Sequence, residues 1–141
     1  MTSSGGCAMI IFDHVAVAVH SISGALPLFQ DLLGGVPAEG GTGSGFTFQQ
    51  LAFPAGTLEL LEPRGAESFL HRYLVGRGEG LHHVTFKVKD LAHWGARLRR
   101  AGYRVVGDNY EQPDWRELFV HPKGAHGVLI QLAETLPREE W

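Results

Sequence analysis

The sequence has almost no cysteine: Cys7 is the single one among 141 residues. An intrachain disulfide is therefore impossible, and metal sites built from several thiolates are excluded. A reducing compartment is the usual setting for such a chain, so we expect a cytoplasmic protein. Residues 1–9 lack the basic start and the apolar stretch of a secretion signal, and we interpret them as a flexible leader.

Long hydrophobic runs and a surplus of positive charge are also missing. No apolar stretch reaches the ~20 residues that a membrane-spanning helix needs. The formal net charge is −3, with 12 Lys and Arg residues against 15 Asp and Glu residues. Neither a membrane nor a nucleic acid is therefore an expected partner, and we expect a small-molecule substrate instead.

One histidine-containing strand motif occurs twice. Residues 12–17 and residues 81–86 each place a histidine in an alternating apolar segment, the pattern typical of a β-strand. The two histidines, His14 and His83, are 83 − 14 = 69 residues apart. A chain of 141 residues has the usual size of one domain, so the repeat indicates a single domain built from two half-modules.

A second pair of strands repeats with nearly the same spacing. Glu59 corresponds to Gln131 and Glu62 to Glu134, at 131 − 59 = 72 and 134 − 62 = 72 residues. If two such modules pair about a pseudo-twofold axis, both histidines, Glu59 and Gln131 face one cleft. We place the single domain at residues 10–135, with a first module at 10–63, a linker at 64–80, a second module at 81–135 and a tail at 136–141.

The predicted element order is β-α-β-β-β in each module. Helices are expected after Ser21 or Ser23, within the linker, and after Asp90, because Ser and Asp side chains accept the free amide hydrogens of a first helical turn. We expect residues 36–45 to hold a short strand followed by a mobile loop, and residues 107–116 to form a polar loop. The remaining strands are expected at residues 10–19, 46–53, 57–62, 81–88, 103–106, 117–121 and 128–134.

Two histidines and a glutamate in matched positions indicate a metal site. Imidazole nitrogen and carboxylate oxygen are suitable ligands for Zn²⁺, Ni²⁺, Co²⁺, Mn²⁺ or Fe²⁺. Glu59 shares one strand face with Leu61, and burying its carboxylate without a cation would be costly. The alternative is that Glu59 points to solvent, because antiparallel sheets often expose one face.

Four segments resemble the vicinal-oxygen-chelate superfamily, most closely its methylmalonyl-CoA epimerase and glyoxalase I groups. The resemblance covers residues 11–134 and implies an α+β fold, in which two pseudo-twofold-related βαβββ modules form a cupped, partly open mixed β-sheet. The segments are Asp13-His14-Val15-Ala16-Val17-Ala18, Leu58-Glu59-Leu60-Leu61-Glu62-Pro63, Gly78-Glu79-Gly80-Leu81-His82-His83-Val84, and His121-Pro122-Lys123 with Gly127-Val128-Leu129-Ile130-Gln131-Leu132.

The resemblance also implies a cofactor and a partner. One divalent metal ion (Zn, Ni, Co, Mn or Fe) is expected inside the cup, bound by His14, Glu59, His83 and Gln131. His82 is expected on the opposite face of its strand from His83, because strand side chains alternate, and there it would form hydrogen bonds on the outer face. Family members usually pair, so a homodimer is expected.

Two amides depart from the epimerase pattern. The resemblance places a glutamate where this chain has Gln131, and a second glutamate at Gln49 or Gln50. A carboxamide does not accept a proton at neutral pH, so epimerisation by two opposed carboxylates is not expected. Glu59 is left as both ligand and catalytic base, and we predict a glyoxalase-type lyase or isomerase that abstracts a proton next to a metal-bound carbonyl.

Two other functions within the superfamily stay open. Two imidazoles and one carboxylate also suit an Fe(II) ring-cleaving dioxygenase, and relatives that resemble bleomycin-resistance proteins bind drugs without catalysis. Substrate contacts are predicted at Gln49, Trp115, Arg116 and Lys123. The charged groups of Arg116 and Lys123 can hold an anion, or they could equally be solvated. The ring of Trp115 can line the mouth of the cup, or it could pack on its own loop.

Overall fold

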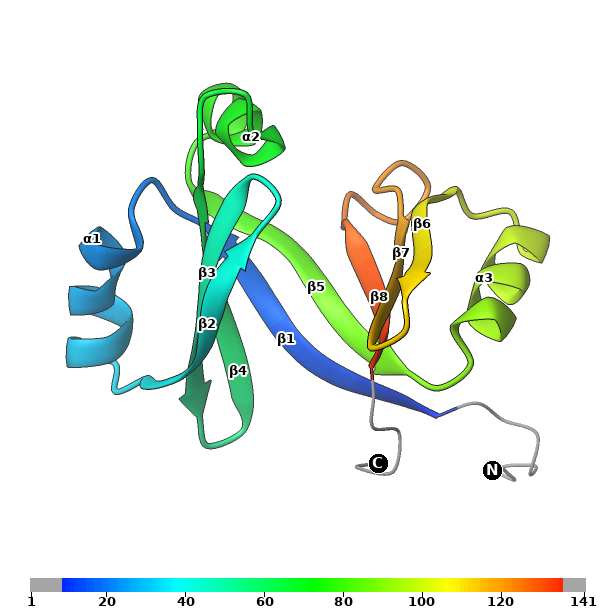
Figure 1. The fold of residues 1–141 in the computed structure, drawn as a ribbon, viewed down its shortest axis with the longest axis horizontal. Helices are drawn as coiled ribbons and strands as arrows, with labels where there is room; N and C mark the ends of the chain where they lie inside the picture. The colour runs from blue at the N-terminus through cyan, green and yellow to red at the C-terminus, as the bar shows by residue number, and fades with distance from the viewer. Residues whose placement is uncertain (1–8, 136–141) are drawn as a thin grey trace. The chain divides into compact units, whose positions relative to one another are not determined.

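The computed structural model describes residues 9–135 (Figure 1). The predictions for residues 1–8 of the leader and for the tail at 136–141 lie outside the described residues. Eight strands form a mixed sheet in the order β2-β3-β4-β1-β5-β8-β7-β6, and three α-helices complete an α+β, glyoxalase-like fold. The elements are β1 (Ile10–Ala18), α1 (Ile22–Leu26), the π-helix η1 (Pro27–Leu32), β2 (Val36–Gly43), β3 (Phe46–Phe53), β4 (Gly56–Pro63), α2 (Phe69–Arg77), β5 (Gly80–Val88), α3 (Leu91–Arg100), β6 (Val105–Gln112), β7 (Trp115–Val120) and β8 (Ile130–Thr135).

This order confirms the duplicated β-α-β-β-β pattern and the linking helix. The chain also divides into two compact units, one of residues 14–82 and the other of residues 9–13 together with 83–135. Within residues 9–135, no helix is both long and apolar enough to cross a membrane.

The unit of residues 14–82 has two packed sheet faces. β1 runs parallel to β4 with Ala16 opposite Glu59, and β3 runs antiparallel to β4. Leu51 and Leu60 are fully buried on one face, where side chains of α1 and η1 pack. The other face carries Glu59. Leu70 and other apolar side chains of α2 pack against a neighbouring part of the same face. Strand alternation therefore separates the apolar core under α1 from the face that carries Glu59.

The second unit repeats this arrangement. β5 runs parallel to β8 with Thr85 opposite Gln131, and β7 runs antiparallel to β8. Apolar side chains of these strands, such as Leu118 and Leu132, form a core with Leu91 of α3. His83, Thr85 and Gln131 alternate with those core residues, so they lie on the sheet face away from α3.

The repeated glutamates at the ends of β4 and β8 hold the first helix of each module. The Glu62 carboxylate accepts a 2.7 Å hydrogen bond from the backbone N–H of Ile22, the first residue of α1. The Glu134 carboxylate accepts a 3.1 Å bond from the backbone N–H of Leu91, the first residue of α3. A carboxylate stabilises a helix N-terminus through its free N–H groups and its dipole. The 72-residue repeat of these two glutamates therefore has a structural role.

The side-chain caps follow the sequence prediction closely. Ser21 accepts from the N–H of Gly24 and Asp90 accepts from the N–H of His93, so both act as N-caps. Asp90 does so with a φ of 64°, in the left-handed region that aspartate tolerates better than most residues.

Two loop predictions are wrong. The segment expected to be a mobile loop within residues 36–45 is mostly β2, whose backbone pairs with β3 from Val36 to Gly43 despite its glycines. The polar loop expected at residues 107–116 is β6, which continues to Gln112 and pairs with β7. In both cases the neighbouring strand satisfies backbone N–H and C=O groups, so side-chain polarity does not decide the conformation.

Candidate metal and acid–base site

His14 and Glu59 form the centre of the candidate site. His14 lies on β1, two residues before Ala16, which is the register partner of Glu59, so both side chains lie on the same sheet face. They are 3% and 9% exposed, and Nε2 of His14 lies 3.4 Å from Oε1 of Glu59. The alternative in which Glu59 points to solvent is therefore wrong.

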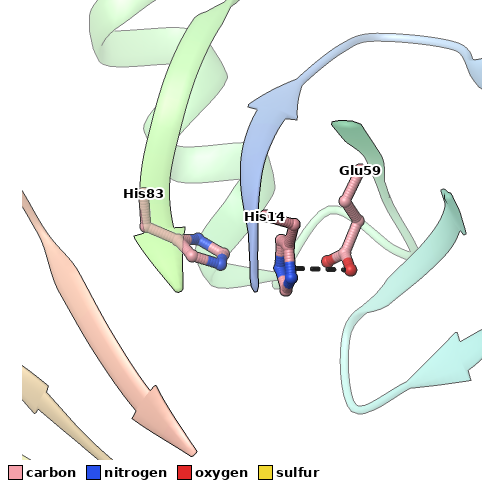
Figure 2. Close-up of side chains that lie close together, drawn as sticks. All are labelled: His14, Glu59 and His83. Carbon is pink, nitrogen blue, oxygen red and sulfur yellow. Dashed lines mark ion pairs between the residues drawn. The ribbon is translucent and has the colours of Figure 1, made fainter. Parts of the chain in front are cut away.

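His83 on β5 supplies a third candidate ligand. One ligand atom from each of His14, Glu59 and His83 lies within 4.8 Å of the other two (Figure 2). The Nε2 atom of His83 is buried. The structure thus brings together three of the four predicted metal ligands, all of nitrogen or carboxylate type.

The Glu59 carboxylate is held by a neighbour on the adjacent strand. Gln50 is the register partner of Glu59, and its side-chain Nε2 donates a 2.9 Å hydrogen bond to Oε1 of Glu59. Metal-binding carboxylates and imidazoles are typically oriented by such outer partners. Gln50 therefore contacts Oε1 of Glu59 and does not contact Oε2.

Gln131, the fourth predicted ligand, sits in its own hydrogen-bond chain. It is buried at 8% exposure on β8. Its Oε1 accepts a 2.7 Å bond from the Thr85 hydroxyl, and its Nε2 donates a 2.8 Å bond to Oε1 of Glu117 on β7. The indole Nε1 of Trp115 donates to the same Glu117 oxygen at 2.9 Å. Both ends of the Gln131 amide are therefore fixed.

The clustered side chains fit a divalent cation. Two ligand atoms each ~2.1 Å from one ion with tetrahedral geometry are roughly 3.4 Å apart, which is the separation between Nε2 of His14 and Oε1 of Glu59. Two imidazoles and one carboxylate suit Zn²⁺, Fe²⁺ and related ions. The low exposure of Glu59 also favours a cation, because a buried carboxylate needs a compensating charge or hydrogen bonds.

The predicted substrate contacts occupy different places. Gln49 is the register partner of Leu60, on the opposite face from Glu59, and its amide bonds to backbone carbonyls, including that of Gln50 at 3.0 Å. Trp115 lies on the same face as Glu117, to which it donates. Lys123 is exposed in the segment after β7.

Arg116 alternates to the other face of β7 from Trp115. It is the register partner of Glu134 and lines a pocket near the start of α3, together with Lys89 and Tyr110. Burial, followed by the charge of Asp108, raises the pKa of the Tyr110 hydroxyl. This pocket therefore lies on the α3 side of the unit, away from the face that carries Gln131.

His82 lies apart from the candidate ligands on β5. Its ring packs edge to face on Tyr73 of α2, with 4.7 Å between centroids, and lies 6.0 Å from the Phe69 ring. Burial lowers the pKa of His82, and the charge of Arg77 lowers it further. The neighbours of His82 are thus aromatic rings of the linking helix. The expectation that it forms hydrogen bonds on the outer face stays a prediction.

Comparisons with known proteins agree with this fold. The family model described as the glyoxalase, bleomycin resistance protein and dioxygenase superfamily matches residues 13–119. The chain belongs to this superfamily. The family predicted from the sequence is thereby confirmed.

Relatives of this superfamily member include acyl-CoA epimerases. An ethylmalonyl-CoA/methylmalonyl-CoA epimerase from Cereibacter sphaeroides is 32% identical over 133 residues, covering 87% of this chain and 96% of the relative. The crystal structure of methylmalonyl-CoA epimerase from Mycobacterium tuberculosis is 31% identical with a TM-score of 0.80, covering 92% of this chain and 90% of that chain. A Streptomyces coelicolor methylmalonyl-CoA epimerase variant in complex with 2-nitronate-propionyl-CoA is 27% identical with a TM-score of 0.78, covering 89% and 97%.

Sequence reasoning missed two polar contacts of the site. Gln50 was one of two candidates for an epimerase glutamate position, and strand pairing makes it the residue beside Glu59. Glu117 had no sequence signal of its own beyond its place in a strand. Its alternation with the apolar Leu118 and Val120 could have indicated which sheet face it occupies.

Proposed function

We propose that this protein is a metal-dependent isomerase or lyase that moves a proton on the carbon next to a carbonyl group, with Glu59 as the base. The observation that carries the proposal is the cluster of His14, Glu59 and His83, whose ligand atoms lie within 4.8 Å of one another. Its relatives named as epimerases support an isomerase reaction in particular.

Each side chain has a distinct role in this proposal. His14, His83 and Glu59, with Gln131 as the fourth ligand, would hold a divalent cation. The cation would polarise the substrate carbonyl and stabilise the negative charge that forms on its oxygen. Glu59 takes the proton from the adjacent carbon, and Gln50 holds Oε1 of Glu59 so that its other oxygen faces the reaction.

The proposed substrates are acyl-CoA thioesters with an acidic hydrogen at C2. The epimerase relatives are named for ethylmalonyl-CoA and methylmalonyl-CoA. A thioester carbonyl lowers the cost of forming a carbanion next to it, which suits a site with one carboxylate base and one Lewis acid.

The experiment uses the full chain loaded in turn with Co²⁺, Mn²⁺, Ni²⁺ and Zn²⁺. Methylmalonyl-CoA, a hemithioacetal of an α-ketoaldehyde and a catechol are tested in parallel, and the thioester is incubated in D₂O. We expect conversion of the C2–H group of methylmalonyl-CoA into C2–D, and chiral analysis then measures whether C2 is also inverted. Glu59→Gln should slow this conversion at least 100-fold, because the amide cannot take the proton. The circular dichroism spectrum of this variant should equal that of wild type.

Two outcomes would contradict the proposal. Wild-type protein that exchanges no C2 hydrogen with any of the four metals would exclude this chemistry on the thioester. Glu59→Gln with full activity would exclude Glu59 as the base. Glu39→Gln is the matched control, because Glu39 is an exposed residue of β2, and it should behave as wild type.

The same three ligands support one other reaction. Two imidazoles and one carboxylate form the ligand set of many non-haem Fe(II) oxygenases, and His14, His83 and Glu59 provide that set here. Oxygen consumption with a catechol after anaerobic loading with Fe²⁺ would favour a ring-cleaving dioxygenase. Thioester exchange without oxygen consumption would favour the isomerase.

A further inference from the structure

A pocket opens on the α3 side of the second unit, and it has a volume of about 410 Å³. Small-molecule sites in proteins typically have volumes of about 300–1,000 Å³. The lining residues all belong to the unit of residues 9–13 and 83–135, so this unit forms the pocket by itself. They are Lys89, Asp90, Ala92, Tyr110, Arg116 and Glu134.

The two carboxylates of the pocket already hold the start of α3. Glu134 accepts the backbone N–H groups of Asp90 at 3.3 Å and Leu91 at 3.1 Å. Oδ1 of Asp90 accepts the backbone N–H of His93 at 3.3 Å. These N–H groups at the helix end are therefore satisfied inside the protein, and the helix end is not the binding element of the pocket.

The side-chain donors of Arg116 and Tyr110 lack comparable acceptors. Nε of Arg116 is buried and has no hydrogen-bond partner. Arg116 is the register partner of Glu134, but within residues 9–135 its guanidinium forms no ion pair. Burial raises the pKa of the Tyr110 hydroxyl, so this group stays protonated at neutral pH and can donate a hydrogen bond. Since buried polar groups are normally hydrogen-bonded, the pocket needs an acceptor from outside the chain.

The charges around the pocket favour one class of acceptor. The positive charges of Lys89 and Arg116 balance the negative charges of Asp90 and Glu134. A carboxylate adds one negative charge, and its planar shape matches the donors of a guanidinium. A phosphate group adds about −1.5 to −2 charges at neutral pH, so it is repelled more strongly by the two carboxylates of the pocket.

We propose that this pocket is a binding site for the carboxylate group of a small organic acid, with the Arg116 guanidinium and the Tyr110 hydroxyl as donors. A carboxylate group fills a small part of the pocket, and the remaining volume holds the organic part of the acid. The inference does not depend on the proposed function, because Arg116 lies on the other sheet face from Gln131. It gives the protein a second ligand site besides the candidate metal site.

The test measures anion binding at Arg116 directly. The full chain is labelled with ¹⁵N, and the Arg116 Nε–H resonance is assigned by its absence from the spectrum of Arg116→Gln. Acetate, inorganic phosphate and chloride are titrated in turn at constant ionic strength. The same titrations are followed through backbone resonances in Arg116→Gln, Tyr110→Phe, Arg100→Gln and His83→Ala.

We expect acetate to shift the Arg116 resonance of wild type in a saturable way and to bind more tightly than phosphate. Arg116→Gln should raise the Kd of acetate at least about tenfold, because a hydrogen bond to a charged group is lost. Tyr110→Phe should raise it about threefold, because one neutral donor is lost and the ring is kept. Arg100→Gln, at an exposed position of α3, is the matched control and should keep the wild-type Kd. His83→Ala should also keep it.

Each other result would overturn the inference. A saturable shift that is absent with acetate, or tighter binding of phosphate than of acetate, would exclude a carboxylate site. An unchanged Kd in Arg116→Gln would exclude Arg116 as a donor. If Arg116→Gln does not fold, an unchanged Kd in Tyr110→Phe together with an unshifted Arg116 resonance in wild type decides against the site. Loss of acetate binding in His83→Ala would place the anion at the candidate metal site instead.

Discussion

The side-chain amide of Gln50 donates a 2.9 Å hydrogen bond to Oε1 of Glu59, its register partner on the next strand. The adjacent Gln49 lies on the opposite face and bonds to backbone carbonyls instead. Two neighbouring glutamines therefore differ in whether they contact the candidate metal ligand. This difference provides a matched pair of variants.

Gln50→Ala should weaken metal binding about tenfold, because loss of an outer partner of a ligand typically costs 10- to 100-fold in affinity. Gln49→Ala should keep the wild-type affinity. Competition with a coloured chelator measures both. Equal affinities for the two variants would show that the Gln50 contact does not orient Glu59.

Divalent metal should stabilise the fold through His83. An ion at 100 times its Kd adds about 2.7 kcal/mol to the free energy of unfolding when it binds only the folded chain. Chelator-treated wild type should therefore gain several degrees in Tm when metal is added. His83→Ala should lose most of that gain, and His20→Ala, at an exposed position, should keep it. The same Tm rise in His83→Ala would exclude His83 as a ligand.

Loss of the Glu134 carboxylate should destabilise the start of α3. It accepts the backbone N–H groups of Asp90 at 3.3 Å and Leu91 at 3.1 Å. Glu134→Ala leaves these donors without their acceptor and should lower the free energy of unfolding by about 1–3 kcal/mol in urea denaturation. Glu111→Ala at an exposed site should change it by less than about 0.5 kcal/mol. A change of that small size in Glu134→Ala would contradict the helix contact.

His82 should make stability depend on pH in the acidic range. Its folded pKa is lowered from the ordinary value of 6.5, first by burial and then by Arg77. The unfolded chain therefore binds a proton more readily, and this histidine destabilises the fold as pH falls below 6.5 toward its folded pKa. Above 6.5 the effect is absent. Denaturant titrations at several pH values should show a smaller acid-induced loss for His82→Gln than for wild type, and equal losses would contradict burial of the neutral ring.

Much of the site could be predicted from residue identity and repeat spacing. The matched positions of His14 and His83 indicated shared roles, and the alternation around Glu59 placed it on one strand face. Those features depend on the period of two in a strand, which the sequence shows directly. The predicted helix caps at Ser21 and Asp90 were correct for a similar reason, since a cap is a local interaction within one helical turn.

Contacts between strands were harder to predict. Gln50 instead of Gln49 lies beside Glu59 because the β3–β4 turn fixes the register, and a shift of one residue would exchange them. The extent of β2 and β6 was missed because their polar, glycine-containing sequences resemble loops. Pairing with β3 and β7 satisfies their backbone groups.

The sequence by itself determined the duplicated βαβββ pattern and the two histidines and one glutamate proposed as ligands, because each follows from residue type and spacing along the chain. The superfamily was predicted from the resemblance of whole motifs and confirmed by the family model. Only the tertiary structure decided which partners hold those side chains. It joined Gln50 to Glu59 and Gln131 to Glu117, and it placed Arg116 on the α3 side of β7. Those relationships depend on strand register, which is set by pairing between segments that are distant in the chain.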